Sequence, residues 1–331
     1  MGYHLVEPFR YGCGLVTNNF TRIGSFFYIG SLCPTLTKIA LVRVLRFHTS
    51  EINDICVNNF MGISASDDRT ISVWSTTDYS RMITLEKHTS NVLSACLTPD
   101  NRFAVSGSDD TTAIVWNIAT GESIFTLKAH TSFVNSVAVT PDGRNIITAS
   151  WDDTLSIWDI STGQQIKSLV GHRGNVNGVA VSPDGQVIAS CSDDGEIKLW
   201  SLDQGQLLKT FTTHSSGVNN ISFSPSGQTF VTASDDKTAR LWDITTGREI
   251  LQLRGHTKAV SDASISNDAT LILTCSYDGS VIVWDYFTGV RLARFEANIS
   301  LRCLAVSGSR DNLNAFVGDQ IGQIHVLKGT L

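Results

Sequence analysis

The sequence is poor in charged residues and has no long apolar run, and both absences narrow what the protein can be. Only 17% of its 331 residues are charged, and the net charge of −6 argues against nucleic-acid binding, which normally needs a basic face. The seven cysteines include no CxxC pair and lie mostly in apolar runs, which favours buried thiols in a reducing compartment. The start, MGYHLVEPFR, lacks the order of a signal peptide, and the apolar stretch 23–32 is too short to span a bilayer. We therefore expect an intracellular protein without a membrane span, cytoplasmic with the nucleus as an alternative.

What the sequence does have is repetition with a period of 42 residues. The repeated tryptophans are Trp74, Trp116, Trp158, Trp200, Trp242 and Trp284. The repeated histidines are His88, His130, His172, His214 and His256, with His48 at a spacing of 40 before the first of them. Six copies in register indicate a repeat architecture rather than a chance motif.

Each copy predicts four short strands. Runs such as VNSVAV, NIITAS and LSIWDI are β-branched, free of proline and separated by turn sequences such as TPDG and SPSG. A single four-stranded sheet cannot bury both of its faces, so successive sheets must stack. Stacking around an axis achieves this while leaving only short edges. The prediction is an all-β fold of four-stranded antiparallel sheets.

The copies also resemble a known family. GHRGNVNGVAVSPDGQVIASCSDDGEIKLW (171–200) and GHTKAVSDASISNDATLILTCSYDGSVIVWD (255–285) are similar to WD40 repeats, and the resemblance covers residues 41–331. It implies a β-propeller that acts as an interaction scaffold. A degenerate seventh copy has Asn298, Gly318, Gln320 and Val326 where the 42-residue register places His, Ser, Asp and Trp.

The seventh copy ends just after its third strand. The segment LVRVLRF (41–47) occupies the place of a fourth strand before the first His, so we expect it to close the last blade. The prediction is therefore a seven-bladed propeller over 41–331. It is preceded by an N-terminal extension, 1–40, which could be a cap, an extra strand or the remnant of an upstream domain.

The recurring polar residues predict a structural role. His130, Ser150 and Asp152 would suit a catalytic triad, but a triad is needed once and these residues recur around the ring. The resemblance implies a buried chain from Trp to Ser to His to Asp in each blade. The expected tetrads are His88, Ser108, Asp110, Trp116; His130, Ser150, Asp152, Trp158; His172, Ser192, Asp194, Trp200; His214, Ser234, Asp236, Trp242; and His256, Ser276, Asp278, Trp284. We expect no catalytic residue, metal or cofactor.

The positions that differ between copies are the candidates for recognition. The first strand of a blade starts at the face where its antiparallel second strand ends. The residues three and five after each His, and the residue before each structural Asp, should therefore cluster on one face, a frequent docking surface in the family. The partner-binding candidates are Phe133, Trp151, Tyr277, Leu93, Asp67, Asp109, Asp193, Asp235, Asp319, Glu51, Asn135 and Asn177. The degenerate blade should add Leu301 and Cys303.

This predicted face is acidic and rich in Asn, with an aromatic cluster of Phe133 and Trp151. It suits a protein or peptide partner that carries basic and apolar residues, within a multiprotein complex. Two structural alternatives remain: the Asp residues could simply solvate turns, and the aromatic pair could pack against the N-terminal extension.

The leading hypothesis is a non-catalytic interaction scaffold. A phosphopeptide-reading adaptor needs converging basic groups, whereas Arg69, Arg173, Lys258 and Arg302 are expected near the same face but scattered over different blades, and the Asp residues oppose a phosphate. The chain could also be the C-terminal propeller of a larger scaffold with BEACH or NACHT domains. An enzyme that uses the central channel is a further alternative, although no metal-ligand cluster, phosphate loop or paired-carboxylate motif supports it.

Overall fold

The computed structural model describes residues 22–23, 26–27, 38–212 and 214–330. The chain divides into two units, residues 1–35 and 36–331. In the first unit, β1 (Arg22–Ile23) pairs antiparallel with β2 (Phe26–Phe27). Most of the predicted N-terminal extension, residues 1–40, lies outside the described residues.

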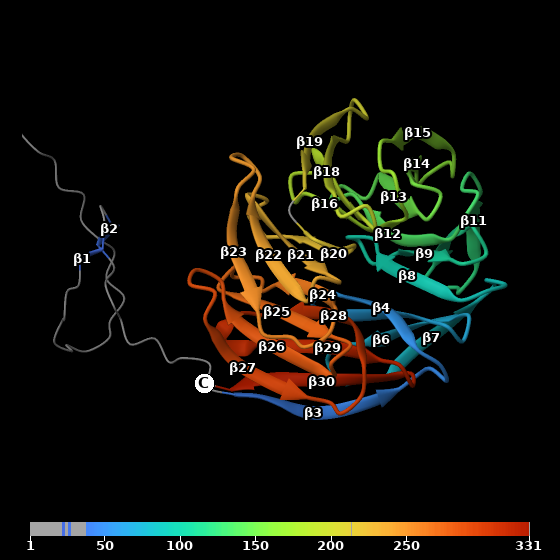
Figure 1. Ribbon diagram of the computed structural model, residues 1–331. Coiled ribbons are helices and arrows are strands. Elements are labelled where there is room, and N and C mark those ends of the chain that lie inside the picture. Colours follow the sequence, from blue (N-terminus) through green and yellow to red (C-terminus); the bar gives the residue numbers. More distant parts are fainter. Residues whose placement is uncertain (1–21, 24–25, 28–37, 213, 331) are drawn as a thin grey trace, which may run out of the picture. The chain divides into compact units, whose positions relative to one another are not determined.

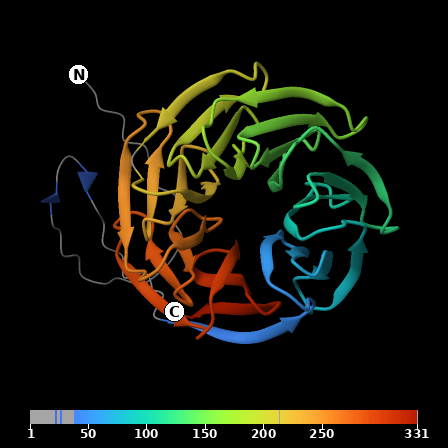
Figure 2. The same ribbon diagram turned by 45° about the vertical axis from the view of Figure 1, so that its right-hand side comes forward.

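The second unit contains seven four-stranded antiparallel sheets arranged as a ring, as Figure 2 shows. We number these blades one to seven, beginning with the sheet of β4 to β7, and the strands of each blade from the centre of the ring outward. The innermost strands are β4 (Ile52–Val57), β8 (Val92–Leu97), β12 (Val134–Val139), β16 (Val176–Val181), β20 (Val218–Phe223), β24 (Val260–Ile265) and β28 (Leu301–Ser307). The second strands are β5 (Met61–Ser66), β9 (Phe103–Ser108), β13 (Asn145–Ser150), β17 (Val187–Ser192), β21 (Thr229–Ser234), β25 (Leu271–Ser276) and β29 (Asn314–Asp319).

The outer half of each blade completes the sheet. The third strands are β6 (Thr70–Ser75), β10 (Ala113–Asn117), β14 (Thr154–Asp159), β18 (Ile197–Ser201), β22 (Thr238–Asp243), β26 (Ser280–Asp285) and β30 (Gln323–Thr330). The outermost strands are β7 (Arg81–Glu86), β11 (Ser123–Leu127), β15 (Gln165–Val170), β19 (Leu207–Phe211), β23 (Glu249–Arg254), β27 (Arg291–Glu296) and β3 (Lys38–Arg46). The prediction of seven blades is confirmed. Within the described residues, no helix is long and apolar enough to cross a membrane.

Blade seven joins the two ends of the ring. Strand β3 pairs antiparallel with β30, from Lys38 opposite Thr330 to Arg46 opposite Gln323. Figure 1 shows these two strands side by side at the lower edge of the molecule. The predicted closing strand is therefore confirmed, and it begins three residues before the expected start at 41.

The hydrophobic core lies between neighbouring blades. In β13, for example, every residue from Ile146 to Ser150 is buried, because both faces of the sheet are covered by adjacent sheets. Each of seven core clusters joins the middle strands of one blade to the inner strands of the next, as Val231 of blade five does with Ile272 of blade six. At about 25 cal/mol per Å² of buried apolar surface, this stacking is the main favourable contribution to folding.

The degenerate blade departs from the 42-residue register in both directions. Leu301 lies opposite Asp319 as Val260 lies opposite Ser276, so β28 comes one residue early and the end of β29 one residue late. The turn between these strands is longer than in the other blades and contains a 3-10 helix, η1 (Arg310–Asn312). The positions predicted at Asn298, Gly318, Gln320 and Val326 are therefore each off by one, and the equivalent residues are Ala297, Asp319, Ile321 and Leu327.

Candidate interaction face

The residues of the predicted face share a backbone contact that recurs in six blades. The residue before each structural Asp donates its N–H to the carbonyl of the third residue after the His. In blade three, Trp151 N donates to Phe133 O at 3.0 Å, and in blade four Asp193 N donates to Asn175 O at 3.0 Å. This bond joins the start of each innermost strand to the end of its second strand, which brings the variable side chains to one end of the ring.

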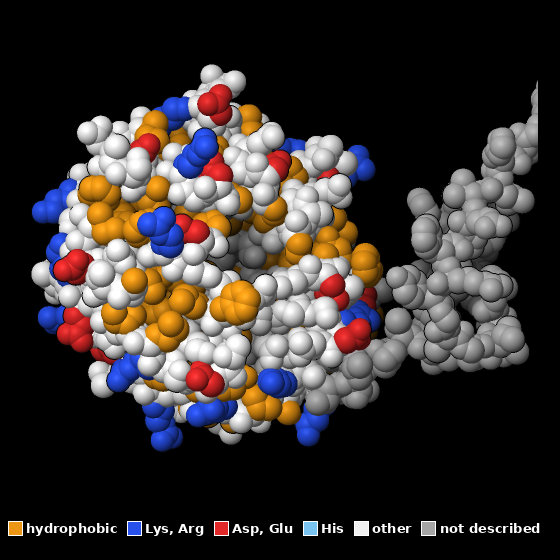
Figure 3. Space-filling model, turned by 180° about the vertical axis from the view of Figure 1, so that it is seen from behind, with side chains coloured by type: hydrophobic (Ala, Val, Ile, Leu, Met, Phe, Trp, Pro, Cys, Tyr) orange, Lys and Arg blue, Asp and Glu red, His pale blue; other side chains and the backbone are white. Residues whose placement is uncertain are grey.

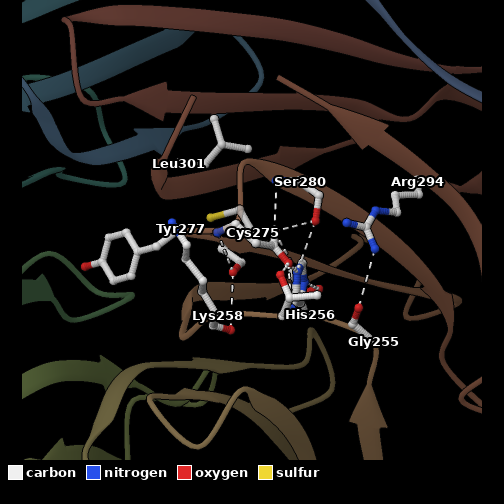
Figure 4. Close-up of polar contacts among 12 residues, drawn as sticks. Gly255, His256, Lys258, Cys275, Tyr277, Ser280, Arg294 and Leu301 are labelled. Carbon is white, nitrogen blue, oxygen red and sulfur yellow. Dashed lines mark hydrogen bonds and ion pairs between the residues drawn. The ribbon is translucent and has the colours of Figure 1, made fainter. Parts of the chain in front are cut away.

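Buried polar chains lie beneath this face. In blade two, Trp116 Nε1 donates to Ser106 Oγ at 2.9 Å, and this hydroxyl lies 2.8 Å from His88 Nε2. His88 Nδ1 in turn lies 2.8 Å from Asp110 Oδ2. A neutral imidazole protonated at Nδ1 satisfies both contacts, since it donates to the carboxylate and accepts from the hydroxyl. Figure 4 shows part of the blade-six equivalent, in which His256 also contacts Ser280.

The hydroxyl in this chain is not the one that the sequence analysis selected. The bridging residues are Ser106, Thr148, Ser190, Thr232 and Thr274, each two positions before the predicted serine. The cause is the strand register. Trp158 lies directly opposite Ile146, and its indole reaches two residues along the same sheet face to Thr148 and not four residues to Ser150.

The predicted serines have a different structural role. Ser150 Oγ accepts from Asp152 N at 3.1 Å and donates to Ser132 O at 3.3 Å, so it ties the turn after β13 to the loop that precedes β12. Equivalent bonds from the Asp N–H are made by Ser108, Ser192, Ser234 and Ser276.

Blade one and blade seven differ from the other blades. In blade one His48 contacts Ser64 at 2.8 Å, but Trp74 Nε1 is buried without a partner, and its ring packs 5.0 Å from Phe316 of blade seven. Blade seven contains a different pair, in which His325 Nε2 lies 2.8 Å from Asp319 Oδ2. Asp319 is only 1% exposed, so its prediction as a partner-binding residue is wrong.

The His–Asp contacts stabilise the ionised carboxylates. Burial opposes ionisation, but hydrogen bonds from His172 and from backbone N–H groups lower the pKa of Asp194 to about 2. In blade six, burial is likewise outweighed by bonds from Ser280, Thr257 and His256, and the pKa of Asp278 falls to about 2. Both carboxylates are thus held in their ionised form by neighbouring donors.

The aromatic pair of blade three lies on the face. The rings of Phe133 and Trp151 are 5.2 Å apart between centroids, and each residue is 36% exposed. Trp151 Nε1 donates to Asn177 Oδ1 of blade four at 3.2 Å, which orients the indole. The pair is therefore an ordered apolar platform.

The Asn residues of the face connect neighbouring blades. Asn177 Nδ2 donates both to Asp193 Oδ1 at 2.6 Å and to Val218 O of the next blade at 3.1 Å. Asn219 makes the same two contacts with Asp235 and Val260, and Asn135 donates to the Asn177 carbonyl at 2.6 Å. The amide groups of Asn177 and Asn219 thus donate to partners within the protein, while Asp193 and Asp235 are exposed.

The register shift of blade seven changes which of its residues occupies a variable position of the face, where the sequence predicted Leu301 and Cys303 and placed Arg302 only nearby. Leu301 and Cys303 are buried, and the position equivalent to Asn53 and Asn177 is Arg302. Arg302 Nη1 donates to Tyr277 OH at 2.8 Å, and its guanidinium carbon lies 5.9 Å from the centre of the Tyr277 ring. The shift changes no residue of the repeat motif that could be recognised in this degenerate copy. The only signal for it in the sequence is the longer turn between β28 and β29.

At the centre of the ring lie two cavities that are lined mainly by residues of the innermost strands. One cavity of about 350 Å³ is lined by residues of the face, including Asn53, Leu93, Trp151, Asp193 and Arg302. A second, of about 330 Å³, is lined by Cys56, Cys96, Ala138 and other residues further along these strands. Figure 3 shows one end of the ring, where hydrophobic side chains gather around a central hollow and most charged side chains lie nearer the edge.

Two carboxylates outside the repeat pattern, Asp54 and Asp262, line both cavities. Asp54 Oδ2 accepts from Ser94 Oγ at 2.7 Å, and Asp262 Oδ2 accepts from Leu304 N at 2.7 Å, so each carboxylate links two blades. Burial, with a contribution from the charge of Asp54, raises the pKa of Asp262 to about 7. Among the described residues, no group of three or more His, Cys, Asp or Glu could hold a metal ion.

A comparison with protein-family models gives one match. The model described as WD domain, G-beta repeat matches residues 39–75, 79–117, 121–159, 163–201, 205–243 and 247–285, which together exceed half of the chain. No curated protein matches the chain.

Proposed function

Because this chain belongs to the WD40-repeat family, whose propellers commonly serve as protein-interaction scaffolds, we propose that it is a non-catalytic scaffold that binds a protein partner on the face around Phe133 and Trp151. The observation that carries the proposal is the exposed, ordered aromatic pair. The equivalent positions in blade four are Asn175 and Asp193, so the fold itself does not require aromatic residues there. Tyr and Trp side chains are the residues that most often dominate the binding energy of an interface.

The charges around the pair support a basic partner. Asp109 of blade two and Asp193 of blade four belong to the blades on either side of the aromatic pair. Burial raises the pKa of Asp109, and the negative charge of Asp67 raises it further, against an opposing effect from the charge of Arg302. Carboxylates placed in this way accelerate the approach of a basic segment, and a cation can also lie over the indole ring.

The polar groups that resemble catalytic machinery are accounted for by the fold. His130 contacts both Thr148 and Asp152 in a buried chain, which leaves it no free nitrogen for a substrate. The same arrangement in blades two, four, five and six favours a structural role for these groups.

The experiment is partner capture from cell lysate by the immobilised protein, with quantification of the captured proteins. We expect the double variant Phe133→Ala/Trp151→Ala to lose capture while keeping the melting temperature of the wild type to within a few degrees. Phe60→Ala is the matched control, because Phe60 is 68% exposed in the β4–β5 turn at the opposite end of blade one. Capture that survives the double variant, or that is equally lost in the control, contradicts the proposal.

A further inference from the structure

On the predicted face, the positive charge and the exposed negative charges lie on different sides of the central cavity. Among the described residues that line this cavity, Arg302 is the only Lys or Arg, whereas Asp193 and Asp235 are exposed carboxylates on blades four and five. Asp54 and Asp262, on the two blades beside blade seven, also line the cavity, but burial raises the pKa of both carboxyl groups and so opposes their negative charge. Arg302 is on blade seven and Asp193 is on blade four. In a ring of seven blades, blade seven faces blades three and four across the centre, so the cation lies opposite the aromatic pair.

The guanidinium of Arg302 is oriented by its neighbours, but it does not donate all of its N–H groups to them. Its Nη1 donates to Tyr277 OH, and its contact with Tyr277 fixes the plane of the group. Glu51 forms an ion pair with Arg302, but its Oε1 is 3.8 Å from Nε, too far for a hydrogen bond. A guanidinium has five N–H donors in a planar fork, so further donors are available to an arriving anion. The side chain is 36% exposed.

We propose that the bound segment is dipolar: it places a basic side chain over Trp151 and Asp193 and, across the central cavity, a carboxylate side chain on Arg302. This inference rests on the proposed function and specifies its partner. The two charged anchors fix the direction in which the segment crosses the ring, since the reversed direction places its carboxylate beside Asp193 and its basic group beside Arg302. Such like-charge pairing is a source of binding specificity.

The geometry favours a carboxylate over a phosphate. Recognition of a phosphate group normally uses several converging basic groups, and this cavity is lined by one. The carboxylates of Glu51 and Asp67 already act on Arg302 through their charges, so a dianion at this site would meet more repulsion than a monoanion. The available donors match the two oxygens of a single carboxylate.

The probe is a displayed library of random twelve-residue peptides, selected on the wild type, on Arg302→Ala, on Arg302→Glu and on Trp151→Ala. Arg144→Ala is the control, because the Arg144 side chain is 83% exposed in the β12–β13 turn at the other end of blade three. We expect the wild type and the control to select peptides with a basic and an acidic residue at a fixed separation. The acidic residue should disappear from peptides selected on Arg302→Ala and be replaced by a basic one on Arg302→Glu.

A second measurement does not depend on the folding of any variant. Selected peptides are synthesised with Gln or phosphoserine in place of the acidic residue, and their affinity for the wild type is measured. We expect Gln to weaken binding about tenfold or more, as for loss of one charged hydrogen-bonded pair, and phosphoserine to bind no better than Glu. Binding unaffected by Gln, or tighter with phosphoserine, overturns the dipolar inference and leaves the scaffold proposal intact. Failure to select any peptide whose binding needs Trp151 overturns both.

Discussion

Trp158 and Thr148 are joined by a hydrogen bond of 2.9 Å from the indole N–H to the hydroxyl, two residues before the serine that a Ser-His-Asp reading selects. The same hydroxyl lies 2.7 Å from His130 Nε2, so one buried oxygen serves two side chains. The Thr148 hydroxyl on the second strand therefore connects the third strand, through Trp158, with the loop that carries His130.

Thr148→Val should destabilise the protein by about 1–3 kcal/mol. The substitution preserves shape but leaves Trp158 Nε1 and His130 Nε2 buried without a partner. Thr126→Val on the exposed outer strand β11 is the control and should change the free energy of unfolding by less than about 0.5 kcal/mol. Denaturant unfolding measures both values, and equal effects would show that the buried hydroxyl is not the important group.

Trp116→Phe should destabilise the protein more than Trp74→Phe. Both tryptophans are buried and lose the same volume, but only Trp116 Nε1 has a hydrogen-bond partner, whereas Trp74 Nε1 has none. The difference between the two variants therefore isolates the indole hydrogen bond, for which we expect about 1 kcal/mol or more. Thermal or denaturant unfolding of the pair checks this, and a larger loss in Trp74→Phe would contradict it.

The sequence was sufficient for the architecture because the repeat encodes it many times over. The turn residues and the tryptophans fix the strands, and the match between 41–47 and the other outer strands predicts the closure between β3 and β30. The bridging hydroxyl was missed because Thr148 and Ser150 lie on the same face of β13, and only the pairing of Trp158 with Ile146 decides between them.

The register error in blade seven has another physical cause. A longer turn before β29 shifts Asp319 from the predicted surface position into the buried one, and an early start of β28 brings Arg302 to the face. Two shifts of one residue in opposite directions cannot be recognised from the sequence where the repeat motif itself has degenerated. Only the three-dimensional pairing shows them.

Asp262→Asn should reduce the pH dependence of stability between about pH 4 and 8. The pKa of Asp262 is raised by burial to about 7, above the ordinary value near 3.9, so the folded protein binds the proton more tightly than the unfolded chain. The stability that this group contributes is complete below pH 4 and is lost as the pH rises through 7.

Asparagine is uncharged at every pH, like the protonated side chain of Asp262, but its amide nitrogen cannot accept either of the backbone N–H bonds that the two Asp262 oxygens accept. The loss of an acceptor lowers the stability of the variant by the same amount at every pH, so we expect the stability of the variant minus that of the wild type to rise by more than about 1 kcal/mol from pH 4 to pH 8, because each pKa unit corresponds to about 1.4 kcal/mol. Chemical unfolding at several pH values gives the difference between the two proteins, in which the titration of other groups largely cancels. A constant difference from pH 4 to 8 would be inconsistent with a raised pKa.

Leu45→Ala should destabilise the entire ring, because closure joins the two ends of the propeller. Leu45 is 4% exposed on β3 and packs in the cluster that joins blade seven to blade one. Truncating a buried Leu costs about 2–5 kcal/mol. Leu41→Ala on the same strand is the control, since Leu41 is 42% exposed and its removal should cost less than about 1 kcal/mol.

If β3 closes the ring, hydrogen exchange in Leu45→Ala should accelerate in blades seven and one first, since these lose a shared boundary, and spread to blades three and four last. Exchange that accelerates only within β3 would show that the remaining blades hold the ring without it.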